Sequence, residues 1–91
     1  MIYSIKPTSR FKKDLKTILK RGYDRDLLAK VINALSAGEK LDEIYKDHAL
    51  TGDYIGHREC HIQPDWLLIY RYDDDVLVLT LSRTGTHSDL F

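Results

Sequence analysis

Most of the side chains that could do chemistry stand in the second half of the sequence. Asp65 and Arg83 accompany four histidines, which are His48, His57, His61 and His87. Histidine titrates near neutral pH, so an imidazole can donate or accept a proton there, and an arginine can hold a phosphate through two parallel hydrogen bonds. A base, an acid and a cation are what metal-free cleavage of an RNA phosphodiester requires. No serine or cysteine is suitably placed to act as a nucleophile instead.

Two aromatic residues accompany this set, and each has two possible roles. Trp66 opens an apolar stretch, and Phe91 is the last residue of the sequence. Either ring could stack on an unpaired base, an interaction of roughly 1 to 3 kcal/mol. Trp66 could equally be a core residue, and Phe91 could pin the tail to the core. The polar residues have similar alternatives, since Asp65 after Pro64 is a good turn residue and Arg83 could end a strand in a salt bridge.

A metal site is a second possibility. His57, Glu59 and His61 alternate along one predicted strand, so their side chains share a face, and two histidines with one carboxylate form a known zinc-binding set. Alternate residues of an extended strand lie about 6 to 7 Å apart, so three ligands from one strand would converge only at a bulge. The sequence shows no signal for a bulge there, which favours metal-free chemistry.

The elements that must position these residues follow from the apolar pattern. A short strand is predicted at residues 2–5, and a helix follows Pro7 and ends at Gly22. Asp24 can cap a second helix, which Gly38 closes. Three more strands are predicted, at residues 54–62, 66–72 and 76–83. We therefore expect an α+β fold in which two N-terminal helices pack on a small, mainly antiparallel sheet of about four strands.

The last two predicted strands are apolar at nearly every position, which indicates burial on both faces. The helices should cover one face and leave the other for further contacts. In an antiparallel meander, the loop after Arg83 can fold back across the strand ends near Asp65. His48, His61 and His87 could then gather with these two residues in one cluster.

Length and composition limit the class of protein. Residues 1–91 are predicted to form one domain, because 91 residues with 43% apolar content suit a single modest core. The single cysteine, Cys60, excludes an internal disulfide and fits a reducing compartment. Neither a signal peptide nor a membrane span is visible, so we expect a cytoplasmic protein without a membrane partner.

The formal net charge is zero, but the charges are unevenly distributed. Residues 1–30 carry nine Lys or Arg residues against three acidic residues. This excess could form a basic face that meets RNA phosphates, or it could be a solvated helix surface. Charge alone does not decide between the two.

The C-terminal half also carries a specific set of motifs. They are "YKDHAL" from residue 45, a glycine at residue 52, "GHRECHIQPDWLLIY" from residue 56 and "RTGTHSDLF" from residue 83. These motifs resemble those of the YafQ-type branch of the RelE/ParE toxin superfamily, written loosely as Y-K-D-H-x-L, G-x-R-x-x-H-x-x-P-D-W-x-L-I-Y and R-T-G-T-H-x-x-L-F. The N-terminal half is similar only in its strand, helix, helix layout and its basic character.

The resemblance implies a ribosome-dependent endoribonuclease that cleaves mRNA in the ribosomal A site, inhibits translation and is held inactive by a cognate antitoxin. It implies that no metal or other cofactor takes part. Attack by the 2′-hydroxyl would leave a 2′,3′-cyclic phosphate or 3′-phosphate and a 5′-hydroxyl end. Carried over by position, the catalytic residues are His48, His61, Asp65, Arg83 and His87, and the substrate-binding residues are Trp66 and Phe91. His57 matches no fixed position of the family.

An alternative function comes from the same superfamily. Some RelE/ParE toxins bind a protein target such as DNA gyrase and cut nothing. We expect such non-catalytic branches to lack three histidines, an aspartate and an arginine at the matching positions. The predicted cluster therefore favours the nuclease.

Overall fold

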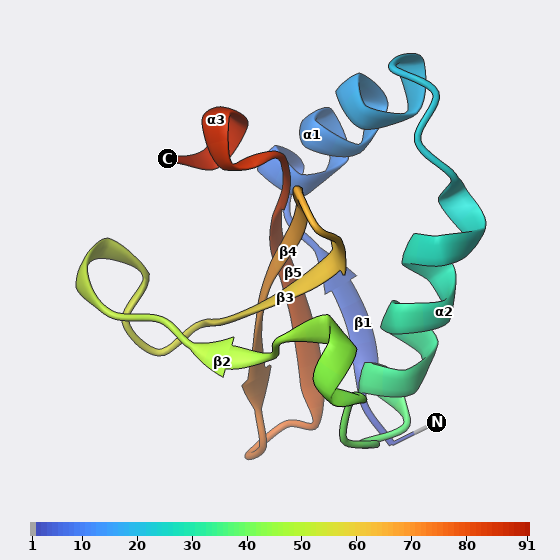
Figure 1. The fold of residues 1–91 in the computed structure, drawn as a ribbon. Coiled ribbons are helices and arrows are strands. Elements are labelled where there is room, and N and C mark those ends of the chain that lie inside the picture. The colour runs from blue at the N-terminus through green and yellow to red at the C-terminus, as the bar shows by residue number, and fades with distance from the viewer. Residues whose placement is uncertain (1) are drawn as a thin grey trace.

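The computed structural model describes residues 2–91, and a five-stranded sheet lies at its centre. Figure 1 shows the elements in chain order, coloured from blue to red. Their bounds are β1 Ser4–Pro7, α1 Ser9–Lys20, α2 Arg25–Ser36, β2 His48–Ala49, β3 Arg58–Gln63, β4 Trp66–Asp73, β5 Val78–Gly85 and α3 His87–Leu90, with short 3-10 turns at Glu43–Tyr45 and Gly52–Tyr54. The α+β class predicted from the sequence is confirmed.

The two long helices begin where the sequence indicates. Thr8 caps α1 by accepting a hydrogen bond from the backbone N–H of Phe11, and Asp24 caps α2 through the backbone N–H of Asp26. Such caps satisfy backbone donors that the first helical turn leaves free. Both helices are followed by a glycine with positive φ, a conformation that costs a glycine little.

The sheet has the order β1-β5-β4-β3-β2, and its strands β2 to β5 pair in antiparallel fashion. β1 runs parallel to β5, which makes the sheet mixed. The sequence predicted about four strands, and the fifth is the two-residue β2, in which His48 pairs with Glu59. A strand of two residues carries too little pattern to be recognised from sequence.

The predicted strand at 54–62 starts later than expected. Residues 52–54 form a 3-10 turn, and β3 begins at Arg58. The predicted strand at 76–83 also starts late, because Leu77 adopts a positive φ of 53° in the turn before β5. The first strand is shifted in the same direction, from residues 2–5 to Ser4–Pro7. Local turn geometry sets the first two of these boundaries.

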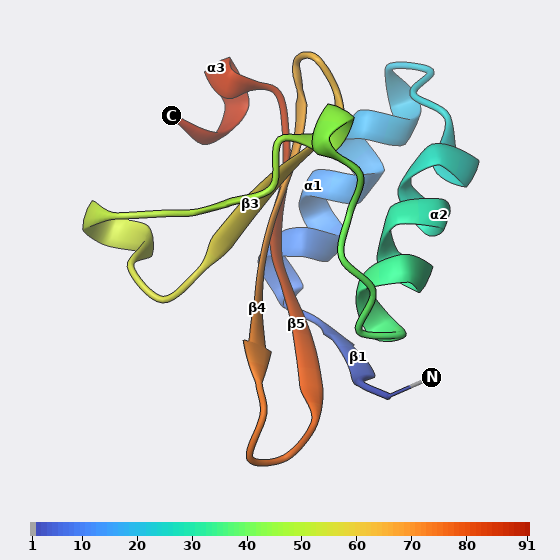
Figure 2. The same cartoon turned by 60° about the horizontal axis from the view of Figure 1, so that its bottom comes forward.

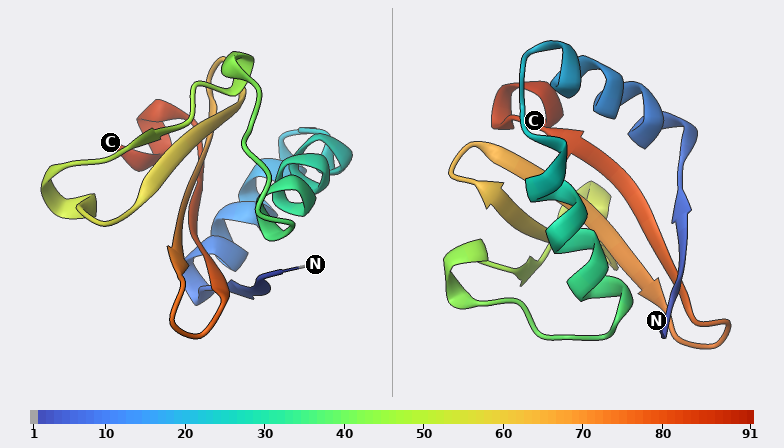
Figure 3. Two further views of the ribbon diagram at one scale, coloured as in Figure 1. Left: turned by 90° about the horizontal axis from the view of Figure 1, so that it is seen from below. Right: turned by 90° about the vertical axis from the view of Figure 1, so that its right-hand side faces the viewer.

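β4 is buried on both faces, as its apolar sequence indicated. Trp66, Leu68 and Tyr70 join the core under α1 and α2, whereas Leu67 and Ile69 point to the opposite face and pack with Leu90. Figure 2 and Figure 3 show α1 and α2 on one side of the sheet, and α3 with the long β2–β3 excursion on the other. The second face of the sheet is therefore covered by the C-terminal tail, residues 86–91, and by the loop between β2 and β3, residues 50–57.

Within residues 2–91, no helix is long and apolar enough to cross a membrane.

Candidate active site

The tail carries His87 on the first turn of α3. Thr86 caps this helix, and its capping box with Asp89 satisfies backbone donors at both ends of the turn. One oxygen of Asp65, Oδ1, accepts hydrogen bonds from the backbone N–H of His87 at 3.0 Å and from its Nδ1 at 2.7 Å. The backbone and then the side-chain bond from His87 lower the pKa of Asp65, so this carboxyl is ionised at neutral pH.

The His87 ring has a defined tautomer as a result. An ionised carboxylate can only accept, so Nδ1 of His87 must carry the proton of this hydrogen bond. In the neutral ring, Nε2 of His87 then has a free lone pair. Nε2 of His87 is thus the basic nitrogen that the tail offers for proton transfer.

His61 and His48 are oriented in the same way. Nδ1 of His61 donates to the carbonyl oxygen of Pro64 at 3.2 Å, and Nδ1 of His48 donates to that of Lys46 at 2.7 Å. The ring centroids of His61 and His87 are 5.8 Å apart, and those of His48 and His61 are 6.4 Å apart. The structure therefore brings together the three predicted histidines and Asp65.

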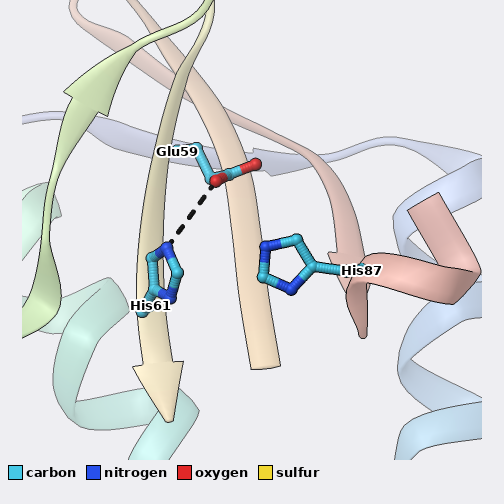
Figure 4. Close-up of side chains that lie close together, drawn as sticks. All are labelled: Glu59, His61 and His87. Atoms are coloured by element: carbon cyan, nitrogen blue, oxygen red, sulfur yellow. Dashed lines mark ion pairs between the residues drawn. The ribbon is translucent and has the colours of Figure 1, made fainter. Parts of the chain in front are cut away.

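Glu59 lies at the centre of this group and was not among the predicted catalytic residues. Its Oε1 is 3.5 Å from Nε2 of His48 and 3.8 Å from Nε2 of His61, and the residue is only 5% exposed. Figure 4 shows the Glu59 carboxylate above the rings of His61 and His87, which come from β3 and α3. The one sequence signal for Glu59 is its alternation with His61 along a strand.

Arg83 lies on the same face of the sheet, two strands away from Glu59. Glu59 pairs with Ile69, and Ile69 pairs with Arg83, so the three side chains share one face. Asp14 of α1 accepts from Nε of Arg83 at 2.7 Å and from its NH2 group at 3.2 Å. This carboxylate raises the pKa of Arg83 and fixes the direction of its guanidinium.

Asp14 is a partner that sequence reasoning missed. It lies 69 residues before Arg83 in the chain, and it also accepts a hydrogen bond from the backbone N–H of Thr84. Nothing in the sequence distinguishes Asp14 from an ordinary charged residue on the surface of a helix. The predicted alternative role for Arg83, a salt bridge at the end of a strand, is present, but the side chain still lies on the face that carries the histidines.

The two predicted aromatic residues have different environments. Phe91 is 68% exposed, and its ring meets that of Tyr54 edge to face at a centroid distance of 6.0 Å. A shallow pocket between the tail and the 3-10 turn is lined by both rings and by Leu90. Phe91 is therefore available to a ligand, and Leu90 is the residue that anchors the tail to the core.

Trp66 is not available to a substrate, and its predicted place in the binding site is wrong. The residue is 0% exposed and faces α1 and α2, on the side of the sheet opposite the histidines. Its Nε1 donates to the Thr84 hydroxyl at 2.9 Å, and its ring packs against Tyr23. The reason is the alternation of side chains along β4, which sends Trp66 to one face and Leu67 to the other.

The tail has a second anchor that the sequence did not reveal. Arg21, which follows α1, donates two hydrogen bonds to Asp89 at 2.7 and 3.1 Å. These bonds and those from Thr86 hold the pKa of Asp89 well below its usual range. The charge pair joins residues that are 68 positions apart and fixes the helix that carries His87.

His57 lies outside the cluster. It precedes β3, its ring packs on that of Tyr54 at 5.8 Å, and its buried Nδ1 has no hydrogen-bond partner within residues 2–91. The residues that could hold a metal ion are instead Glu59, His61 and His87, whose potential ligand atoms all lie within 4.8 Å of one another. The tail supplies the third member in place of His57.

The arrangement matches a known family of proteins. The family described as the bacterial toxin of type II toxin-antitoxin system, YafQ, matches residues 3–91. The chain therefore belongs to the YafQ toxin family.

Individual relatives agree with this assignment over nearly the whole chain. The mRNA interferase toxin YafQ of Escherichia coli strain K12 is 39% identical over 88 residues, which cover 96% of this chain and 94% of that protein. A metal-bound toxin from Helicobacter pylori superposes with a TM-score of 0.92 at 43% identity, with both chains fully covered. In the E. coli DinJ-YafQ complex the matching chain gives a TM-score of 0.88 at 38% identity, with 98% of each chain covered.

Proposed function

We propose that this toxin is a ribosome-dependent endoribonuclease that cleaves mRNA in the ribosomal A site by metal-independent acid-base catalysis and so inhibits translation. The observation that carries the proposal is the pair formed by His61 and His87. Their rings face each other at 5.8 Å, and an acceptor on Nδ1 of each ring leaves Nε2 for chemistry. The mRNA interferase name of the E. coli relative supports the same reaction class.

The reaction assigns one proton transfer to each ring. One imidazole removes the proton of the 2′-hydroxyl, whose oxygen attacks the adjacent phosphorus. The bond from phosphorus to the 5′-oxygen then breaks, and the protonated second imidazole gives its proton to that oxygen. The products are a 2′,3′-cyclic phosphate, which can open to a 3′-phosphate, and a 5′-hydroxyl. We place His87 as the acid and His61 as the base, with His48 beside His61.

Asp65 has an orienting role in this mechanism. Its lowered pKa makes the carboxylate a weak base, and its Oδ1 is already engaged by two donors from His87. A carboxylate in this position holds the imidazole in one tautomer and stabilises its protonated form.

Arg83 supplies positive charge to the reacting phosphate. The guanidinium has further N–H donors besides the two that bond to Asp14. Asp14 holds this group on the face of the sheet that carries the histidines. A fixed cation stabilises the extra negative charge that builds up on phosphorus oxygens in the transition state. Phe91 is exposed at the end of the tail and offers a flat surface for a base.

The partners in this proposal are the ribosome with its mRNA and a cognate antitoxin. A complex of the E. coli relative with DinJ supports the antitoxin. The basic N-terminal part of the chain could meet either RNA or an acidic antitoxin segment. Coexpression with the neighbouring small reading frame should give a stable complex and relieve growth arrest.

The decisive experiment is single-turnover cleavage of a defined message bound to purified ribosomes. His87→Ala should lower the rate by roughly 100-fold or more, as expected for a general acid-base group. His57→Gln is the matched control, because it removes a histidine outside the cluster, and it should cleave at close to the wild-type rate. Cleavage by His87→Ala at the wild-type rate would refute the assignment. Growth arrest by a wild-type protein that cuts no message would favour the non-catalytic alternative.

A further inference from the structure

We propose that a pocket beside His61 binds the nucleotide on the 5′ side of the scissile phosphate, which is the nucleotide whose 2′-hydroxyl attacks. This assignment rests on the proposed function, because it names where one part of the message lies. The pocket is formed by the first turn of α2, the 3-10 turn Glu43–Tyr45 and the end of β3, and its volume is about 470 Å³. Sites for small molecules typically have volumes of about 300 to 1,000 Å³.

The wall of this pocket is mainly apolar. The apolar residues that line it are Leu27, Ile44, Ile62 and Pro64. Ile44 is 76% exposed and Leu27 is 36% exposed, and exposed apolar surface that is contiguous indicates a binding site. Tyr45 adds an aromatic side chain to the wall. Because unpaired RNA bases bind by stacking on rings and apolar surface, the wall suits the flat face of a base.

Two polar side chains of the pocket suit the other parts of a nucleotide. Lys46 lines the pocket, is exposed and forms no ion pair within residues 2–91. Its ammonium group is therefore available to a backbone phosphate. Gln63 is also exposed, and its amide has both donors and an acceptor for the edge of a base. An apolar wall with a few polar groups is the usual form of a ligand pocket.

The pocket is continuous with the candidate active site. His61 lines it, and so does Pro64, whose carbonyl oxygen accepts a hydrogen bond from Nδ1 of His61. Lys46 makes the same connection to His48, because its carbonyl oxygen accepts from Nδ1 of that ring. A nucleotide in the pocket would thus contact the residues that orient both imidazoles. This continuity favours RNA over a protein segment as the occupant.

The two rings of the proposed acid and base decide which nucleotide the pocket takes. His61, the base, lines the pocket, and His87, the acid, is not part of its lining. Figure 4 shows that the two rings come from different elements, β3 and the tail. The base acts on the 2′-hydroxyl of the 5′ nucleotide, whereas the acid acts on the 5′-oxygen of the next one. The pocket therefore takes the 5′ nucleotide, and the exposed Phe91, on the tail with His87, is left for the 3′ nucleotide.

A titration followed by NMR tests the pocket without reference to activity. We expect adenosine 3′-monophosphate and uridine 3′-monophosphate to shift the methyl signals of Leu27, Ile44 and Ile62 in a saturable way, and ribose 5-phosphate, which lacks a base, not to do so. Ile44→Ser should weaken binding by about 3-fold or more, since it removes part of the apolar wall. Ile55→Ser is the matched control, because Ile55 is 77% exposed and lies outside the pocket. Absence of saturable shifts, or equal shifts with ribose 5-phosphate, would overturn the site.

Single-turnover cleavage at saturating toxin then tests which nucleotide is bound. The ribosome-bound message lacks one base, either that of the 5′ nucleotide or that of the 3′ nucleotide at the cut. Loss of the 5′ base should slow the wild type and Ile55→Ser by about 5-fold or more, and Ile44→Ser by much less, because the two changes remove the same contact. Loss of the 3′ base should slow all three proteins by the same factor.

The possible results separate the competing explanations. An equal effect of the missing 5′ base on Ile44→Ser and the wild type would overturn the assignment, and so would coupling of Ile44 to the 3′ base. Normal cleavage by Ile44→Ser together with loss of its antitoxin complex would identify the pocket as a docking site for protein. A wild type that cuts no message would overturn the proposed function and the assignment of the 5′ nucleotide with it, whereas the titration would still decide whether the pocket binds nucleotides.

Discussion

Asp65 and His87 are joined twice through one atom: Oδ1 of Asp65 accepts from both the backbone N–H and the imidazole Nδ1 of His87. The two residues are 22 positions apart, and Asp65 stands in the turn between β3 and β4 while His87 opens α3. One carboxylate oxygen therefore sets the position of the tail and the tautomer of its histidine at the same time.

Substitution of Asp65 should show how much the two hydrogen bonds together contribute to cleavage. Asp65→Ala removes both hydrogen bonds and should lower single-turnover cleavage by about 10-fold or more, within the range of general acid-base contributions. Asp65→Asn keeps a neutral acceptor for both donors and should retain more activity than Asp65→Ala. Because Asp65 is exposed, both variants should melt like the wild type. Equal activity of Asp65→Ala and the wild type would contradict the orienting role.

The Arg21–Asp89 pair should control the mobility of the tail. In Arg21→Gln we expect faster hydrogen exchange of the amides in residues 87–91, because one of the tail's anchors is lost. Lys20→Gln is the matched control, since Lys20 is also exposed at the end of α1 and is not in this pair. Unchanged exchange in Arg21→Gln would show that Leu90 and the Asp65 bonds hold the tail by themselves.

The same pair predicts a pH dependence of tail protection. The pKa of Asp89 in the folded protein is lowered from the ordinary value of 3.8, mainly by Arg21. The stability that the Arg21–Asp89 pair gives to the tail is therefore complete above the ordinary pKa of Asp89. It is lost only as the pH falls through the lowered pKa of the folded protein. Exchange of the tail amides, corrected for its intrinsic pH dependence, should show constant protection from about pH 5 to 8. Loss of protection near pH 6 would mean that a histidine, and not Asp89, governs the tail.

Leu90 and Phe91 should have opposite phenotypes. Deletion of Phe91, an exposed ring, should leave the melting temperature nearly unchanged and weaken cleavage. Leu90→Ala should lower the free energy of unfolding by about 2 kcal/mol, because Leu90 packs on buried Leu67 and Ile69. A large drop in melting temperature on deletion of Phe91, with cleavage preserved, would instead identify Phe91 as a structural anchor.

Trp66→Phe should act on stability and not on substrate binding. The substitution removes the hydrogen bond from Nε1 to Thr84 and leaves a gap in a fully buried site. We expect a loss of about 1 to 3 kcal/mol in the free energy of unfolding, with the KM for ribosome-bound message unchanged at low temperature. A raised KM in a variant of normal stability would restore Trp66 to the substrate site.

Local sequence pattern was sufficient for most of the secondary structure. The caps at Thr8 and Asp24, the glycines that follow both helices and the apolar stretch of β4 are signals carried by adjacent residues, so the helices and the antiparallel strands β3 to β5 were predictable. The histidines, Asp65 and Arg83 were recognisable by residue type and by motif, and the meander predicted that the tail returns to the turn that contains Asp65.

Contacts between distant residues could be decided only by the tertiary structure. The Asp14–Arg83 and Arg21–Asp89 pairs and the addition of β1 beside β5 join residues about 70 positions apart, for which no local pattern exists. The tertiary structure also decided that Trp66 is a core residue and not a substrate-binding residue. Only the folded chain shows which face of β4 the helices α1 and α2 cover. The tertiary structure likewise decided that Glu59 lies within the histidine cluster. Alternation along β3 places Glu59 on the same face as His61, but only the folded tail brings His87 close to both.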